Sequence, residues 1–250
     1  MSQQKYLEEV LERFDKANVR PISTPSLPNH HLVRLPSPEV DVKHFQQALG
    51  ALIYLMLGTR PDIAYTVTAL GRHAANPGTE HQHTLDHLFR YLRGTLDYKL
   101  IYRCGISGGD SILGYVDANW GSDVNDRKST LGYTFTLLGG TILWSSKKQS
   151  AVALSSTKAK YIAGAHTAKE AIWLGRLFMG LQQPSSFPIP LHIDNQSAIA
   201  IAKNPEFHDR TKHINIRYHF IRHKVESGDI TLDYMPTNDQ PADVLTKGLA

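Results

Sequence analysis

The spacing of apolar residues predicts mainly helices in the first hundred residues of the chain. From residue 2 to about 17, leucine, valine and phenylalanine recur at intervals of three and four, which places them on one face of a helix. A loop is predicted from 19 to 41, because the prolines of this stretch block regular structure. Three more helices are predicted, from about 42 to 57, from Pro61 to a point before Pro77, and from about 79 to 93.

The pattern changes after residue 104, where short runs of β-branched and aromatic residues replace the helical spacing. These runs predict strands at 112–118, 132–138, 141–145, 191–194 and 230–235. The stretch Leu138-Gly139-Gly140-Thr141 resembles the turn of a hairpin between the second and third strands. Helices are predicted at about 157–181, after Asn195, at about 214–225 and at 239–246. This order predicts an α/β domain at 105–250, with a mixed five-stranded sheet and flanking helices, preceded by a mainly helical domain at 1–104.

The composition is that of a soluble globular protein with one large or two modest domains. Of the 250 residues, 41% are hydrophobic and 20% are charged, and no run approaches the roughly 18–20 apolar residues of a membrane span. The charged N-terminus lacks the pattern of a signal peptide, so no membrane partner is expected. The single cysteine, Cys104, excludes an intramolecular disulfide and suits a reducing compartment. We therefore expect an intracellular location, with the choice between cytoplasm and nucleus left open.

The basic charge of the chain is a weaker signal than it first suggests. A formal net charge of +4 and a pI near 9.0 are typical of proteins that bind nucleic acids. Lys158 and Lys160 stand together at the start of a predicted helix. If both were glutamates, each change would move the charge by two units and the whole excess would vanish. Net charge alone therefore does not identify a partner.

Three aspartates are candidate metal ligands in the α/β domain. Asp117 and Asp194 lie toward the ends of predicted strands, and Asp243 lies in the last predicted helix. Cleavage of a phosphodiester by two metal ions needs several carboxylates near two Mg²⁺ ions roughly 4 Å apart. Asp194 can instead cap the next helix and Asp243 can be a solvated helix residue, whereas Asp117 is harder to explain this way because acids are depleted in strands. A fourth acid at the start of the helix at 157–181 would complete the cluster, but Lys160 stands there.

Several motifs, in this order, resemble the ribonuclease H domain of copia-type retrotransposon polyproteins. They are Gly114–Trp120 (GYVDANW), Asp126–Thr130 (DRKST), Trp144–Gln149 (WSSKKQ), Ala153–Thr157 (ALSST), Asp194–Ala198 (DNQSA), Arg210–Ile214 (RTKHI) and Ala242–Lys247 (ADVLTK). In the first half, Gly58–Ile63 (GTRPDI) and Arg90–Thr95 (RYLRGT) resemble the thumb and connection of the reverse transcriptase in the same polyproteins. The resemblance covers nearly the whole chain. The Tyr-x-Asp-Asp metal motif of the polymerase is absent from the sequence, so no polymerisation is expected.

The resemblance implies roles for single residues. It makes Asp117, Asp194 and Asp243 the metal-binding catalytic aspartates, with Mg²⁺ as cofactor and an RNA–DNA hybrid as the substrate whose RNA strand is cut. The family's fourth acid is the second glutamate of Glu-Ala-Glu-Tyr, where this chain has Lys158-Ala159-Lys160-Tyr161. An ammonium at position 160 removes a ligand and repels a cation, and Lys160 can instead pair with Asp117 or Asp194. An inactive or nearly inactive endonuclease is therefore expected.

A basic cluster before and within the helix at 214–225 is the candidate nucleic-acid contact. Arg210, Lys212, His213 and Arg217 would bind phosphates of a hybrid, and a solvated basic helix is the simpler alternative.

Other functions remain open at this point. A non-catalytic module that binds a hybrid or a partner protein fits the same fold, and the remaining domains of a polyprotein are further candidate partners. An integrase-like nuclease fits less well, because the motif order differs and the chain lacks a His/Cys zinc module. His81, His83 and His87 suggest a metal site, but no glutamate follows His83 as a metalloprotease motif requires, so a solvated helix face is favoured.

Overall fold

The structure is a computed structural model that describes residues 1–27, 32–33, 39–103, 105, 111–182, 187–203 and 215–248, without the side chains of 215–219. The chain forms two compact units. The helical unit comprises Met1–Ile101, Asp123–Arg127 and the residues from Lys247, and the sheet unit comprises Tyr102–Ser122 and Lys128–Thr246. The predicted boundary falls at Cys104, which lies outside the described residues. Within the described part of the chain, no helix is long and apolar enough to cross a bilayer.

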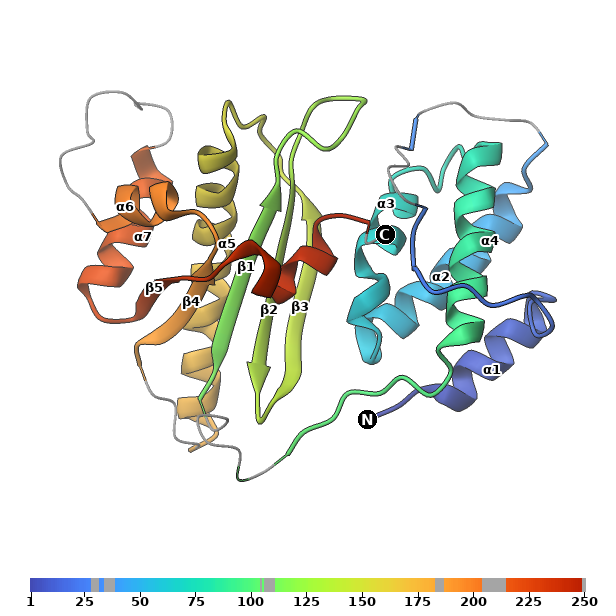
Figure 1. Ribbon diagram of the computed structural model, residues 1–250, viewed down its shortest axis with the longest axis horizontal. Helices are drawn as coiled ribbons and strands as arrows, with labels where there is room; N and C mark the ends of the chain where they lie inside the picture. Colours follow the sequence, from blue (N-terminus) through green and yellow to red (C-terminus); the bar gives the residue numbers. More distant parts are fainter. Residues whose placement is uncertain are drawn as a thin grey trace. The chain divides into compact units, whose positions relative to one another are not determined.

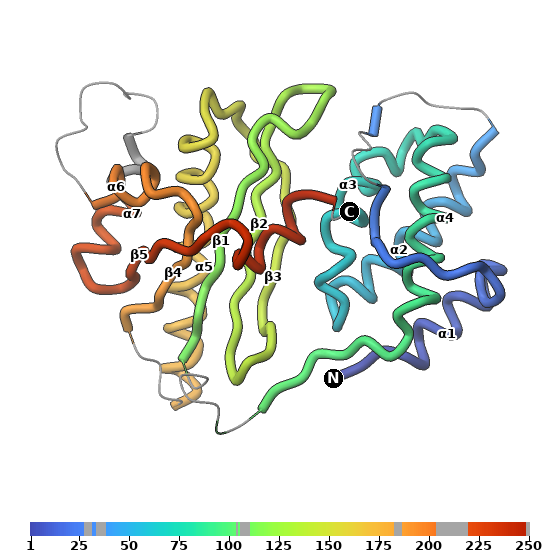
Figure 2. The backbone as a smooth tube through the Cα atoms, in the orientation of Figure 1, coloured from blue at the N-terminus to red at the C-terminus, as the bar shows by residue number. Residues whose placement is uncertain are grey.

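The helical unit contains the predicted helices. They are α1 (Gln4–Arg13), α2 (Val42–Gly58), α3 (Ala64–Gly71) and α4 (Thr79–Gly94), and α3 follows a 3-10 turn, η1 (Pro61–Ile63). α1 is shorter than predicted, and Pro61 starts the 3-10 turn rather than the α-helix itself. α1 and α4 lie side by side although they are far apart in sequence (Figure 2). Their apolar faces, with that of α2, form one buried core.

The sheet unit is built on a mixed five-stranded sheet, as predicted. Its strands are β1 (Leu113–Asn119), β2 (Thr130–Leu137), β3 (Gly140–Lys148), β4 (Ile189–Ile193) and β5 (Ile230–Tyr234). They lie in the order β3-β2-β1-β4-β5 (Figure 1). β1 is antiparallel to β2 and parallel to β4, and β4 is parallel to β5. This arrangement confirms the ribonuclease H-like fold.

The predicted hairpin joins β2 and β3 through a two-residue turn. Leu138 and Gly139 have φ angles of 54° and 71°. Two successive positive φ angles match the right-handed twist of the strands, and glycine adopts such an angle without strain. Leucine at the first position is uncommon there, and the glycine beside it favours the turn.

Alternation along β1 sends its side chains to opposite faces of the sheet. Val116 and Ala118 are buried in a core that they share with α5 (Ser156–Gly180). α6 (Gln196–Lys203) and α7 (Asn215–Glu226) pack against α5. Asp117, between the two core residues, therefore lies on the other face of the sheet.

On that other face the chain crosses β1 and β2 as two 3-10 turns (Figure 1). These are η3 (Thr237–Asp239) and η4 (Pro241–Leu245). The prediction of a regular helix at 239–246 is therefore wrong. A proline disfavours helical backbone in the residue before it, and Gln240, which precedes Pro241, is extended.

Gly132 on β2 lets the C-terminal segment, residues 237–246, pack closely on the sheet. A Cβ atom at Gly132 would lie 2.7 Å from Cγ2 of Thr246 and 2.8 Å from Cβ of Leu245. Gly132 is also the cross-strand partner of Asp117. The close approach therefore places η4 directly beside the candidate site.

Candidate active site

The parallel pairing of β1 with β4 brings Asp117 and Asp194 together. Val116 pairs with Ile193, and continuing this register by one residue places Asp117 beside Asp194. Paired residues of neighbouring strands point to the same face of a sheet. Asp194 directly follows β4 rather than ending it. Two acids that are far apart in sequence thus become neighbours.

Lys160 reaches this pair from the first turns of α5. The helix begins after Ser155, whose hydroxyl accepts a hydrogen bond of 3.2 Å from the backbone N–H of Lys158. The Nζ atom of Lys160 lies 3.1 Å from Oδ1 of Asp117 and also donates to Oδ1 of Asp194. The side chains of Lys160, Asp117 and Asp194 are only 15%, 5% and 2% exposed. One ammonium therefore bridges two nearly buried carboxylates.

The remaining carboxylate oxygens are bound by two threonines of the C-terminal segment. The hydroxyl of Thr246 donates to Oδ2 of Asp117, and the hydroxyl of Thr237 donates to Oδ2 of Asp194 at 2.9 Å. All four oxygens of the two carboxylates thus accept a hydrogen bond from a side chain. We call Asp117, Lys160, Asp194, Thr237 and Thr246 the Lys160 cluster.

Gln240 adds a link between the strands that carry the two acids. Its buried side-chain amide donates to the backbone carbonyls of Val116 and His192, both at 3.2 Å. The sequence prediction missed Gln240, Thr237 and Thr246. The available signal was weak: Thr246 lies inside a recognised motif, but nothing in its spacing indicates a contact with Asp117.

The charge state of Lys160 follows from two opposing effects. Burial lowers its pKa, but the negative charges of Asp117 and Asp194 and their hydrogen bonds raise it, and the net pKa lies above the ordinary value for lysine. The side chain is therefore a cation at neutral pH. It occupies the position between the acids where a metal ion would have to bind.

Mg²⁺ does not fit this arrangement. Asp243, the third predicted ligand, lies half-buried on η4, and its backbone carbonyl is 3.1 Å from the Thr246 hydroxyl. Among the residues that the structure describes, no group of three or more His, Cys, Asp or Glu side chains is placed to hold a metal ion. The structure joins Asp117, Asp194 and Lys160 but does not add Asp243 to a metal-binding group. The metal-binding roles of the three aspartates stay predictions.

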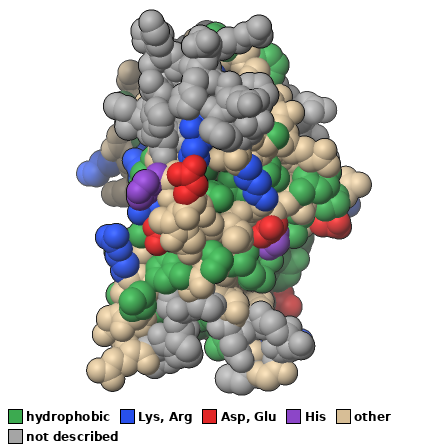
Figure 3. Space-filling view, turned by 90° about the vertical axis from the view of Figure 1, so that its left-hand side faces the viewer, with side chains coloured by type: hydrophobic (Ala, Val, Ile, Leu, Met, Phe, Trp, Pro, Cys, Tyr) green, Lys and Arg blue, Asp and Glu red, His purple; other side chains and the backbone are tan. Residues whose placement is uncertain are grey.

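The residues predicted to contact nucleic acid lie outside the part of the chain whose side chains the structure describes. Arg210, Lys212 and His213 lie outside the described residues, and the side chain of Arg217, in α7, does as well. The described side chains on the face shown in Figure 3 mix Lys and Arg with Asp and Glu. Near the end of α7, Lys224 forms an ion pair of 2.9 Å with Asp229. The described part of this face therefore offers no continuous basic patch.

Two of the three histidines considered as a metal site, His81 and His87, have clear structural contacts. His81 is fully buried, and its Nδ1 accepts a hydrogen bond of 2.8 Å from the backbone N–H of Gly78 at the start of α4. Its ring lies 4.0 Å from that of His73, centroid to centroid. His87 contacts the carbonyl of Thr24 through Nε2 at 3.0 Å. The expected solvated face is therefore wrong for His81, which caps the helix.

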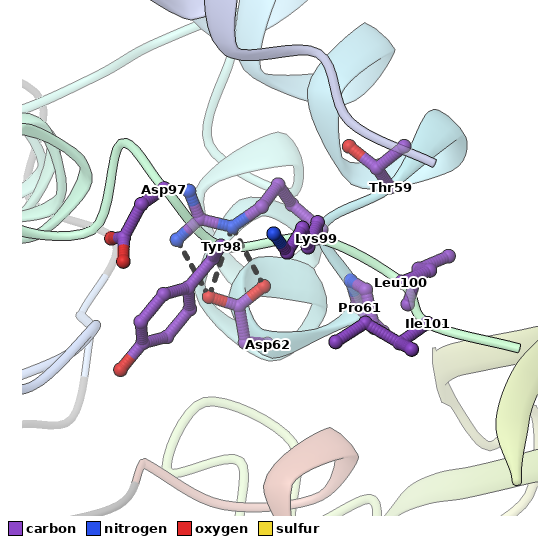
Figure 4. Close-up of a pocket in the computed structure, with 9 residues that line it drawn as sticks. Thr59, Pro61, Asp62, Asp97, Tyr98, Lys99, Leu100 and Ile101 are labelled. Carbon is purple, nitrogen blue, oxygen red and sulfur yellow. Dashed lines mark hydrogen bonds and ion pairs between the residues drawn. The ribbon is translucent and has the colours of Figure 1, made fainter. Parts of the chain in front are cut away.

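Two sequence motifs of the helical unit, Gly58–Ile63 and Arg90–Thr95, meet at a buried arginine. The guanidinium of Arg60 binds the carboxylate of Asp62 through Nε at 3.0 Å and Nη2 at 2.8 Å, as dashed lines in Figure 4 show. It also donates to the carbonyl and the hydroxyl of Thr95, at 3.0 Å and 2.6 Å. The hydroxyl of Tyr91 donates to Asp62 at 2.9 Å. Two motifs that are far apart in sequence are thus joined by one polar network.

A pocket of about 380 Å³ opens beside this network (Figure 4). Its walls are residues 59–62 and 97–101. The half-exposed ring of Tyr98 lies 5.3 Å from the guanidinium carbon of Arg60. Because Arg60 is already bound to Asp62 and Thr95, its charge serves the fold, and we assign the pocket no chemical role.

Two curated relatives match almost the entire chain. It is 44% identical to the retrovirus-related Pol polyprotein from transposon TNT 1-94 of Nicotiana tabacum, over 99% of this chain and 19% of that protein. It is 38% identical to the retrovirus-related Pol polyprotein from transposon RE1 of Arabidopsis thaliana, over 100% of this chain and 17% of that protein. The chain thus spans about a fifth of the length of these relatives. No protein-family model matches it.

A solved structure of the foamy viral protease-reverse transcriptase, in complex with an RNA/DNA hybrid, is similar in fold. The likeness covers 92% of this chain and 27% of that chain, with a TM-score of 0.50 and 15% sequence identity. At that identity it supports a shared fold alone. With its ribonuclease H-like sheet and these two relatives, the chain belongs to the copia-type retrovirus-related Pol polyproteins.

Proposed function

We propose that the sheet unit binds RNA–DNA hybrids and does not hydrolyse their RNA strand. The family and the fold support the hybrid as the ligand, and the foamy viral relative in fold was solved with such a hybrid. The absence of hydrolysis is proposed because the ammonium of Lys160 lies between Asp117 and Asp194. Hydrolysis in this family would require divalent metal ions at those acids.

Simple electrostatics explains why the ammonium opposes such metal binding. Two unit charges 4 Å apart repel by about 4 kcal/mol at an effective dielectric constant near 20, and a divalent ion doubles this cost. The metal would also have to replace the hydrogen bonds that Lys160 donates to Asp117 and Asp194. Lys160 at the same time removes the ligand that a glutamate would supply. The lost carboxylate ligand and the added positive charge both weaken metal binding at Asp117 and Asp194.

The test compares cleavage and binding of one labelled hybrid by the full chain. We expect binding in EDTA, with affinity that falls as salt rises, and no cleavage in Mg²⁺ or Mn²⁺. Lys160→Glu should gain metal-dependent cleavage. Lys158→Glu is the matched control, because it makes the same charge change two residues away and should stay inactive. Cleavage by the unmodified chain, or absence of hybrid binding, would overturn the proposal.

A further inference from the structure

We infer that Lys160 is the permanent cation of this domain, and that the Lys160 cluster attaches the C-terminal segment to the sheet without any metal ion. The inference goes beyond the proposed function, since it concerns the stability of the fold and holds with or without a hybrid.

The first step is the balance of donors and acceptors. Asp117 and Asp194 present four oxygen atoms, and Lys160, Thr246 and Thr237 supply a donor to each of them. Buried carboxylates are stable only when they are paired and hydrogen-bonded. The described residues meet that requirement completely, so the cluster has no need for an added cation.

The second step is the set of elements that the cluster joins. Asp117 belongs to β1, Asp194 follows β4, Lys160 belongs to α5, and both threonines belong to the C-terminal segment. Gln240, on the same segment, binds carbonyls of β1 and β4. The segment contains two 3-10 turns, whose backbone hydrogen bonds, such as that from Thr246 to Asp243, lie within the segment itself. Its attachment therefore depends on these side chains and on the buried Ala242 and Leu245.

The third step is what remains when the ammonium is removed. In Lys160→Met, two nearly buried carboxylates would face each other without a counter-charge, which destabilises the folded state. In Lys160→Glu a third acid joins them. Both changes create a demand for a cation that the unmodified chain does not have. Stability would then depend on divalent ions, which bind the folded state only.

The experiment measures thermal unfolding of the full chain in EDTA, MgCl₂ and MnCl₂ at matched ionic strength, with Mn²⁺ binding followed by electron paramagnetic resonance. For the unmodified chain we expect no Mn²⁺ binding at the cluster. Its midpoint of thermal unfolding should be the same in EDTA, MgCl₂ and MnCl₂. Lys160→Met and Lys160→Glu should have lower midpoints in EDTA, and that of Lys160→Glu should rise steadily with Mn²⁺. Lys158→Met and Lys158→Glu are the matched controls and should behave like the unmodified chain.

Two results would overturn the inference. One is a midpoint of the unmodified chain that rises with Mn²⁺ as steeply as that of Lys160→Glu. The other is a Lys160→Met midpoint equal to that of the unmodified chain in EDTA. Failure of the Lys160 variants to fold, when the Lys158 variants fold, supports the inference. Hybrid binding is measured separately, so the proposed function can fail while this inference stands.

Discussion

The hydroxyl of Thr246 donates a hydrogen bond to the carboxylate of Asp117, which lies 129 positions earlier in the chain. Both residues are buried, and the bond joins the C-terminal segment to the central strand of the sheet. It is also one of the contacts that occupy the oxygens of Asp117. A single hydroxyl thus helps attach the C-terminal segment to the sheet and also occupies one carboxylate oxygen of the candidate site.

Thr246→Val should destabilise the fold by about 1–3 kcal/mol, because it leaves a buried carboxylate oxygen without its donor. Chemical denaturation of the full chain measures this loss. Thr167→Val is the control, since Thr167 is equally buried but donates to the carbonyl of Ala163 within α5, and its loss should be smaller. Equal losses for the two variants would contradict the role of Thr246.

Gly132→Ala should destabilise the fold by about 1–3 kcal/mol, because the new methyl group has no room beneath η4. The same change at Gly50, on the exposed side of α2, meets no atom within 4 Å and should stabilise the protein by about 0.5–1 kcal/mol. The free energies of unfolding of the two variants should therefore change in opposite directions. An unchanged free energy of unfolding in Gly132→Ala would show that the C-terminal segment does not pack closely on β2.

Arg60→Lys should destabilise the helical unit by about 1–3 kcal/mol, although it keeps the positive charge. An ammonium cannot reproduce the planar set of donors that Arg60 directs to Asp62 and Thr95. Arg90→Lys is the control, because Arg90 makes an exposed hydrogen bond to the carbonyl of Arg20. Denaturation followed by a probe in the helical unit distinguishes the two, and similar values would argue against a structural role for the network.

The unfolding free energy should fall as the pH rises from about 10 to about 12. Burial and the charge of Glu170, opposed by a hydrogen bond with Ser145, raise the pKa of Tyr133 to about 12. An acid whose pKa is raised by folding is neutral in the folded state, so its contribution is present below the unfolded pKa near 10 and is lost as the pH rises toward the folded pKa. Tyr133→Phe should reduce this alkaline loss by up to about 2–3 kcal/mol. An unchanged pH profile in that variant would contradict the shift.

The sequence predicted the sheet because its strands depend on local features. Runs of β-branched residues and the glycines of the hairpin have a short-range physical cause, and the five strands lie at the predicted places, with ends that differ by a few residues. The last predicted helix failed for a local reason as well, since the effect of Pro241 on Gln240 outweighs the helical spacing.

The contacts of the Lys160 cluster could be predicted only in part. The motifs identify Asp117, Lys160 and Asp194, and they predict an ion pair of the lysine with either acid. That Lys160 binds both acids depends on the register of two parallel strands and on the position of α5 against them. The roles of Thr237 and Thr246 depend on a segment that contains only 3-10 turns, for which spacing along the chain carries no information.

The two threonine hydroxyls have a further consequence for how this protein can change by mutation. They donate hydrogen bonds to the Oδ2 atoms of Asp117 and Asp194. Each acid therefore keeps one hydrogen-bond donor whatever residue occupies position 160. Codons for lysine and glutamate differ by one nucleotide. One nucleotide change at position 160 can therefore replace the built-in ammonium with a third carboxylate that leaves the acids open to cations from solvent. The reverse change is equally a single mutation.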